Sequence, residues 1–255
     1  MSGLLEVRAL NVVFDGFRAI TDLDFSLAPG ELRFVIGPNG AGKTTLIDVI
    51  TGRTRPASGS VTFDGHELVG RREHRIVRLG IGRTFQTSVV FEELTVGENL
   101  DLAASFRRPV ATLLRRRRGY SEAVRRALDT TGLAELAERR AGVLSHGQRQ
   151  WLEIGMLLAQ GPRLLLLDEP VAGMSRDERE RTGQLLREIA AEHTVVVVEH
   201  DMEFLRRFAT EVTVLHEGQL LCAGSVAQVQ ADPRVQEVYL GRPREGALEV
   251  VDAEG

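Results

Sequence analysis

One stretch, GPNGAGKTT at residues 37–45, constrains the fold of this chain more than any other feature. It follows an apolar run over residues 32–36 and opens an amphipathic segment over residues 46–50. The stretch, called the phosphate loop below, therefore lies between a predicted strand and a predicted helix. It satisfies the pattern G-x-x-x-x-G-K-[ST] at every fixed position, which predicts a site for the phosphates of a nucleotide.

The phosphate loop offers several kinds of contact to a nucleotide. Its glycines let backbone N–H groups turn toward an anion without obstruction by a Cβ atom. Lys43 is long enough to reach β- and γ-phosphate oxygens, and the Thr44 hydroxyl is a ligand type that suits Mg²⁺. The N-terminus of the following helix adds a favourable dipole end. The predicted nucleotide contacts are Gly37, Pro38, Asn39, Gly40, Ala41, Gly42, Lys43, Thr44 and Thr45.

Length and composition narrow the class of protein. A chain of 255 residues suits one large domain, or a domain with an inserted lobe, and 43% hydrophobic content supplies a sizeable core. A net charge of −4 argues against a general nucleic-acid binder. The single cysteine, Cys222, forms no internal disulfide and fits a reducing compartment. Because we find no uncharged apolar stretch of membrane-spanning length and no signal-peptide pattern, we expect a chain that does not cross a membrane by itself.

The N-terminal segment predicts short strands joined by tight turns. Apolar residues alternate from Leu5 to Phe14, and further strands are expected at residues 23–27, 32–36 and 60–65. Such strands favour an antiparallel sheet. Phe14 lies upstream of the phosphate loop, where an aromatic side chain either stacks on adenine or belongs to the core, and the pattern alone favours the core.

Residues 96–144 have a different character, being helical in pattern and rich in arginine. We interpret them as part of a small helical lobe inserted between two parts of an α/β core. The run Arg115–Arg118 is the most concentrated charge in the chain. A solvated surface is the simpler interpretation, and contact with anionic lipid headgroups is the alternative.

The second half of the chain alternates helices and buried strands. Ser145 is a candidate N-cap for a helix that continues to about residue 159. The run from Leu164 to Asp168 is apolar without alternation, which is typical of a parallel strand buried on both faces. Ligands of such sheets bind at the carboxyl ends of strands, where Asp168 and Glu169 are expected.

Motifs farther along the chain resemble those of ATP-binding cassette ATPases. Gln86, the stretch LSHGQ at residues 144–148, the pair Asp168-Glu169 and His200 occur in the order and approximate spacing of that family. The resemblance covers nearly the whole chain. It implies an α/β P-loop fold with an N-terminal antiparallel β subdomain and an inserted helical lobe. The implied division is a catalytic core over residues 1–84 and 160–240, a helical lobe over 85–159 and a tail over 241–255.

The resemblance also implies a role for individual residues. Phe14 is similar to the aromatic residue that stacks on adenine, which reverses the preference given above. Gln86 resembles the glutamine that links the lobes and senses both Mg²⁺ and the attacking water. The other implied roles are Thr44 and Asp168 at Mg²⁺, Glu169 as general base, His200 at the γ-phosphate, and Ser145, Gly147 and Gln148 on ATP held by a second ATPase chain.

These roles have a chemical reason. Phosphoryl transfer to water needs little covalent chemistry, so positioning and charge neutralisation dominate. A carboxylate at the position of Glu169 takes a proton from water, a step that contributes about 10²–10⁴-fold. A histidine at position 200 holds the γ-phosphate and the attacking water in line.

Two departures from the family pattern narrow the resemblance. His146 replaces the usual glycine in LSHGQ, and Ser175 stands where many members have aspartate. The run from Leu144 to Met174 is similar to the ATP-binding proteins of urea importers, a group beside the branched-chain amino acid importers. The expected function is therefore ATP binding and hydrolysis for an importer of urea. An importer of branched-chain amino acids or another small amide is the alternative, and an ABC ATPase that acts on nucleic acid is less favoured.

The resemblance implies partners as well. We expect membrane-embedded permease subunits, a second ATPase that is either a copy or a paralogue, and indirectly a substrate-binding protein, but no nucleic acid. The expected location is the cytoplasmic face of the cell membrane. The edge over residues 85–91 resembles the groove that receives a coupling helix of the permease.

Overall fold

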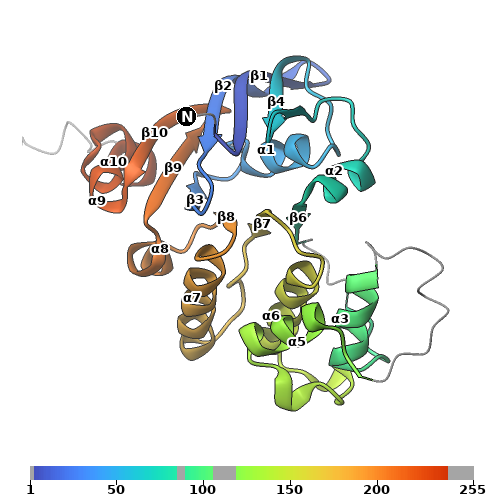
Figure 1. Cartoon of the computed structure of the whole chain (residues 1–255). Coiled ribbons are helices and arrows are strands. Elements are labelled where there is room, and N and C mark those ends of the chain that lie inside the picture. Colours follow the sequence, from blue (N-terminus) through green and yellow to red (C-terminus); the bar gives the residue numbers. More distant parts are fainter. Residues whose placement is uncertain (1–2, 85–89, 106–118, 241–255) are drawn as a thin grey trace, which may run out of the picture.

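A mixed sheet of mostly parallel strands forms the centre of the molecule. The computed structural model describes residues 3–84, 90–105 and 119–240, and the sheet has the order β10-β9-β3-β8-β7-β6 (Figure 1). Strands β9, β3, β8, β7 and β6 run parallel, and β10 pairs antiparallel with β9. The bounds are β3 Leu32–Ile36, β6 Ile81–Arg83, β7 Leu164–Asp168, β8 Thr194–Val198, β9 Glu211–His216 and β10 Gln219–Ser225.

Both faces of this sheet are covered, so each parallel strand supplies two cores. On one face, Phe34, Leu165 and Val197 pack among helices. On the other, Val35 and Val196 join a second core beneath the N-terminal strands. Every residue of β7 and β8 is buried. This burial on both faces explains the continuous apolar runs and confirms the α/β expectation.

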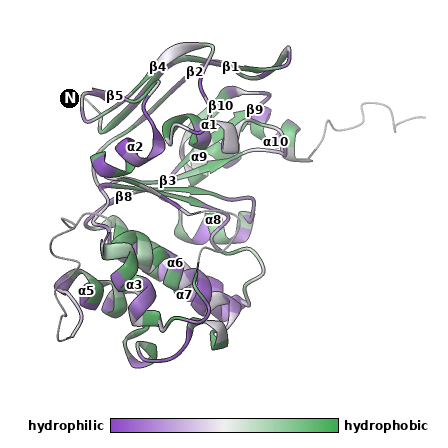
Figure 2. Cartoon of the chain, turned by 90° about the vertical axis from the view of Figure 1, so that its right-hand side faces the viewer, coloured by the Kyte–Doolittle hydropathy of each residue, from purple (hydrophilic) through white to green (hydrophobic). Residues whose placement is uncertain are grey.

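The N-terminal strands form the predicted antiparallel sheet, except that the strand expected with them at residues 32–36 is β3 of the parallel sheet, where it pairs with β8 and β9. Its order is β2-β1-β4-β5, with β1 Leu5–Phe14, β2 Phe17–Leu27, β4 Ser58–Phe63 and β5 His66–Glu67. Figure 2 shows this sheet on one side of the parallel sheet and most of the helices on the other. Helix α1 (Lys43–Ile50) buries Leu46, Ile47, Val49 and Ile50 in the core between the two sheets.

Helices cover the opposite face. α3 (Val96–Ser105), α5 (Glu122–Thr131) and α6 (His146–Leu158) pack against one another, and α7 (Arg176–Ala190) packs on α5 and on α8 (Met202–Phe208). Residues 132–144 are less helical than predicted, because only the short 3-10 helices η1 (Ala134–Leu136) and η2 (Ala141–Val143) lie between α5 and α6. The run Arg115–Arg118 lies outside the described residues.

The remaining elements are short. They are α2 (Glu73–Leu79), α9 (Val226–Ala231) and α10 (Pro233–Leu240). Strand β6 was missed in the sequence because three residues are too few to show a period. Within the described ranges, no helix is long and apolar enough to cross a membrane.

Candidate functional site

The phosphate loop connects β3 to α1 in a conformation that only glycine adopts easily. Gly37 has φ 154°, and a Cβ atom there would lie 2.2 Å from the Leu215 carbonyl oxygen. Gly42 has φ 98°, and its Cβ would lie 2.9 Å from the Ala19 carbonyl oxygen. Neighbouring strands therefore approach the loop too closely for any side chain at these two positions.

The turn between β9 and β10 holds the loop in place. Gly218 donates its N–H to the Ala41 carbonyl at 3.2 Å and accepts a hydrogen bond from Thr21 N at 2.9 Å. Inside the loop, Ala41 N donates to the Pro38 carbonyl at 3.1 Å. The loop is thus held by a hydrogen bond from the supporting turn and by one within the loop itself.

Donors at the start of α1 are left for a ligand. In the described part of the chain, no hydrogen bond uses the N–H of Gly40, Gly42, Lys43, Thr44 or Thr45. The N-cap residue, Gly42, has no side chain to cap the helix. Asn39, Gly40 and Thr44 are exposed, so these donors lie at an open surface. Unpaired N–H groups at a helix N-terminus form an anion-binding site.

Lys43 extends back along this loop. Its Nζ donates to the carbonyls of Gly37 at 2.7 Å and Pro38 at 3.0 Å. Burial lowers the pKa of the ammonium, while the carboxylates of Glu169 and Asp168 act in the opposite direction. The end of β7 therefore lies close enough to the loop for its two carboxylates to influence the lysine.

Asp168 presents a buried oxygen without a hydrogen-bond partner. In the described residues its Oδ2 makes no hydrogen bond, and the Arg83 Nη2 lies 3.6 Å away. Burial raises the pKa of Asp168, and this effect outweighs the nearby Arg83. A carboxylate oxygen that accepts no hydrogen bond, beside a phosphate-binding loop, suits a hard divalent cation, so the donor set fits Mg²⁺.

Arg83 was not among the residues predicted from the sequence. It is buried and bridges Asp168 to Asp48 of α1, so it joins β6, β7 and the helix after the loop. The Thr84 hydroxyl beside it accepts a hydrogen bond from the Asp168 N–H at 3.1 Å. The signal available was the polar pair Arg83-Thr84 at the end of this segment, two residues before Gln86, which itself lies outside the described residues.

Glu169 has an unusual backbone. Its φ is +50°, a conformation that is uncommon for a residue with a side chain. Its N–H donates to the Val198 carbonyl at 2.9 Å, which fixes the turn at the end of β7. In this conformation Glu169 Oε1 lies 3.3 Å from Nδ1 of His200, so the structure brings together two residues that the sequence predicted for one site.

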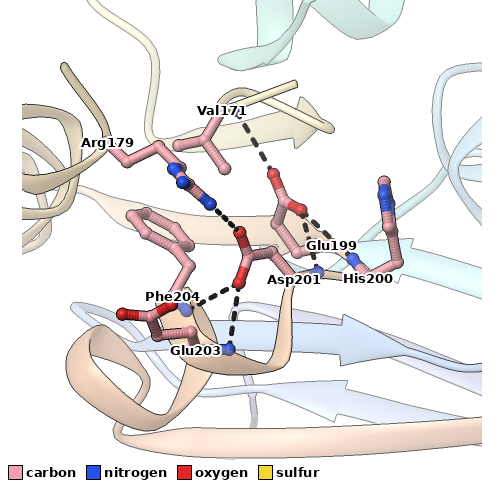
Figure 3. Close-up of polar contacts among 7 residues, drawn as sticks. All are labelled: Val171, Arg179, Glu199, His200, Asp201, Glu203 and Phe204. Atoms are coloured by element: carbon pink, nitrogen blue, oxygen red, sulfur yellow. Dashed lines mark hydrogen bonds and ion pairs between the residues drawn. The ribbon is translucent and has the colours of Figure 1, made fainter. Parts of the chain in front are cut away.

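Figure 3 shows how the neighbouring Glu199 holds the backbone around His200. Its buried carboxylate accepts the N–H groups of Val171 at 3.3 Å, His200 at 3.1 Å and Asp201 at 3.5 Å. Burial raises the pKa of Glu199, and the three N–H groups oppose this rise. The carboxylate therefore ties the segment after β7 to the segment after β8. Sequence reasoning gave Glu199 no role.

Asp201 extends this network to α7. It caps α8 by accepting the N–H groups of Glu203 and Phe204, both at 2.9 Å. Its second oxygen accepts a hydrogen bond from Arg179 Nη1 at 2.6 Å. The start of α7 is thus linked to the residue that follows His200 (Figure 3).

The residues LSHGQ at 144–148, called the signature turn below, form the start of α6. Ser145 is the N-cap as predicted: its Oγ accepts from Gln148 N, and Gln148 Oε1 accepts from Ser145 N at 3.0 Å. His146 Nε2 lies 3.0 Å from the Ala172 carbonyl oxygen. Within the described ranges, no hydrogen bond or ion pair joins Ser145, Gly147 or Gln148 to the phosphate loop. The structure does not bring these two predicted parts of the site into contact within one chain.

Phe14 ends β1, opposite Phe17 at the tip of the first hairpin. Phe14 is 47% exposed, so it is not a core residue. The same hairpin contributes Ala19 and Thr21, which contact the phosphate loop and its supporting turn. An exposed aromatic side chain on the hairpin that borders the loop is available to a planar base.

Known protein families match most of this chain. The family described as ABC transporter matches residues 20–172, and the family described as branched-chain amino acid ATP-binding cassette transporter matches residues 219–245. The high-affinity branched-chain amino acid transport ATP-binding protein BraF of Pseudomonas aeruginosa is 35% identical over 254 residues, covering 93% of this chain and 98% of BraF.

Two solved structures share the fold. The ADP conformation of MJ1267, an ATP-binding cassette of an ABC transporter, has a TM-score of 0.82 and 30% identity, and the match covers 94% of this chain and 100% of that one. The dimeric structure of MJ0796, a bacterial ABC transporter cassette, has a TM-score of 0.73 and 25% identity, covering 87% and 98% of the two chains.

Proposed function

Because this chain belongs to the ABC transporter family, we propose that it is the ATP-hydrolysing subunit of an importer in the branched-chain amino acid group. The observation that carries the proposal is the juxtaposition at the ends of β3 and β7. Unpaired N–H groups and Lys43 form an anion-binding loop beside Asp168, whose Oδ2 accepts no hydrogen bond, and Glu169, which contacts His200.

Each part of this arrangement has a task in hydrolysis. The N–H groups of the loop and the Lys43 ammonium bind the β- and γ-phosphates, where the dipole of α1 adds favourable charge. The Glu169 carboxylate removes a proton from the attacking water, and the His200 imidazole holds the γ-phosphate in line with that water. Mg²⁺, when bound, neutralises phosphate charge, and Thr44, Asp168 and Gln86 are the residues proposed to hold it.

The signature turn supports a working dimer. Because Ser145, Gly147 and Gln148 make no contact with the phosphate loop of their own chain in the described residues, we propose that they bind the nucleotide of a second ATPase chain. That second chain is a copy or a paralogue. The division into a core over residues 1–84 and 160–240, a helical lobe over 85–159 and a tail over 241–255 belongs to the same proposal.

Permease subunits are the proposed membrane partners, and they would place this chain at the cytoplasmic face of the membrane. Phe91, at the described end of the edge over residues 85–91, is 53% exposed, which suits an apolar contact with a partner helix. A separate substrate-binding protein would deliver the cargo to those permease subunits.

The proposed cargo is a branched-chain amino acid, because the relative BraF is a branched-chain amino acid transport protein. Urea, which the sequence resemblance predicted, stays a prediction, because the subunit that hydrolyses ATP does not contact the cargo. Uptake of labelled leucine and labelled urea by vesicles that contain the whole transporter decides between the two.

The catalytic part of the proposal is tested by Glu169→Gln. The amide keeps size and hydrogen bonding but removes the base, so the hydrolysis rate should fall by about 10²–10⁴-fold. ATP then persists, and a dimer should accumulate on a sizing column with Mg²⁺ and ATP. Adding Ser145→Arg should abolish the dimer while each monomer still binds ATP. Hydrolysis at the wild-type rate by the Glu169→Gln variant would remove Glu169 from the mechanism.

A further inference from the structure

The side chain of Glu178 connects the starts of two helices. Glu178 lies in the first turn of α7, and its Oε2 accepts the N–H of the N-cap residue Ser175 at 3.0 Å and the Ser175 hydroxyl at 2.9 Å. This is one half of a capping box, whose other half is the bond from Glu178 N to Ser175 Oγ at 3.3 Å. One carboxylate oxygen is therefore fully explained by the local structure of α7.

The second oxygen has a contact that the capping box does not require. Glu178 Oε1 accepts a hydrogen bond from the hydroxyl of Ser145, at 3.2 Å, across the gap between α7 and the signature turn. It also lies directly over Gly147, where a Cβ atom would approach it to 2.4 Å. A carboxylate thus occupies the N-terminus of α6.

The chemistry of this position is that of an anion site. The hydrogen bonds from Ser175 lower the pKa of Glu178, and the Ser145 hydroxyl and the Gly147 N–H lower it further. The carboxylate is therefore ionised at neutral pH, and it uses the hydroxyl and the N–H that a γ-phosphate would need. Two anions cannot share these donors, because like charges in contact repel each other.

We propose that the Glu178 carboxylate is a built-in competitor for the γ-phosphate at the signature turn, so that ATP held by a second copy of the chain must displace it before the dimer closes. The inference rests on the proposed function. It deepens that function, because competition between the carboxylate and the γ-phosphate sets the ATP concentration at which two chains associate. After displacement, Oε2 stays on Ser175, so the start of α7 remains capped while Oε1 leaves α6.

The chain offers a matched pair of variants. Glu178→Gln removes the charge but keeps a side chain that completes the capping box, since glutamine suits this position as well as glutamate does. Asp177→Asn removes the same charge from the same helical turn, one residue away, at an exposed side chain. The comparison therefore separates displacement at Ser145 from any general effect of charge at the start of α7.

The experiment measures the ATP concentration for half-maximal dimer formation on a sizing column, with Mg²⁺ and ATP in the buffer and Glu169→Gln as the parent. Adding Glu178→Gln should lower this concentration by at least about fivefold, because hydrogen bonds to a charged acceptor are lost from the monomer. Adding Asp177→Asn should leave it near the parent value. ATP binding by each monomer should be the same in all three proteins.

Three outcomes are informative. A Glu178→Gln midpoint equal to or above that of Asp177→Asn would overturn the inference. If Glu178→Gln folds poorly, Glu178→Ala provides the second variant, and its midpoint among folded molecules must also fall. If the parent itself forms no dimer at any ATP concentration, the proposed function fails instead, so the two failures are distinguishable.

Discussion

The contact between Trp151 and Thr182 gives a quantitative test of how α6 is held against α7. Trp151 Nε1 donates to the Thr182 hydroxyl at 2.8 Å, and both side chains are buried. The same hydroxyl donates to the Glu178 carbonyl at 2.8 Å, within α7. The guanidinium of Arg181 lies over the Trp151 ring, 4.3 Å from its centroid. Replacing Thr182 with valine keeps the shape and removes the acceptor.

The expected loss in free energy of unfolding follows from the burial of Trp151 and Thr182. A hydrogen bond between neutral groups contributes about 0.5–1.5 kcal/mol net, and a buried donor left without a partner costs about 1–3 kcal/mol. Because Trp151 Nε1–H would have no alternative acceptor in a dry contact, we expect Thr182→Val to lower the free energy of unfolding by about 1–3 kcal/mol. For a chain of this size, the midpoint of thermal unfolding should fall by about 2–4 °C for each kcal/mol.

The assay uses the fluorescence of Trp151, the only tryptophan in the chain. Unfolding in denaturant is followed by this signal for the wild type and Thr182→Val, and by circular dichroism for all variants. A Trp151→Phe background has no indole N–H that could lose its acceptor. In that background Thr182→Val should lower the free energy of unfolding by at least about 1 kcal/mol less. An equal cost in both backgrounds, or no cost in the wild type, would refute the argument.

Two further predictions concern single groups. Lys43→Ala should weaken ATP binding by at least about tenfold, because the phosphates lose a charge-assisted donor. Unchanged affinity would contradict the assignment of Lys43 to the phosphates. Lys43 is also the only lysine in the chain, so an amine-selective reagent should label it in the wild type and ATP should protect it. Burial, together with a 2.7 Å hydrogen bond to Glu138, raises the pKa of Tyr120 to about 12. Since the folded value exceeds the ordinary 10.0, the contribution to stability is present below pH 10 and is lost as the pH rises through 12. An absorbance titration should show a tyrosine hydroxyl that ionises near pH 12, and Glu138→Gln should move the pKa of Tyr120 toward 10.

The sequence by itself determined the phosphate loop and the order of the main elements. The loop is local: Gly37, Gly42 and Lys43 act within a single strand–turn–helix, so their spacing is visible in the chain. The N-cap at Ser145 was visible for the same reason, since capping residues bond to residues three positions away. Apolar runs such as Leu164–Asp168 also predicted a buried parallel strand, because burial on both faces leaves no alternation.

Only the tertiary structure decided which groups the charged side chains contact. Arg83 meets Asp168 because β6 lies beside β7 in the sheet, and a three-residue strand gives no sign of its neighbour. Glu199 reaches Val171 because β7 and β8 end together. Glu178 reaches Ser145 only because α6 and α7 bury their apolar faces in the same core. These contacts join residues far apart in sequence, and they depend on strand register and helix packing, which no local pattern encodes.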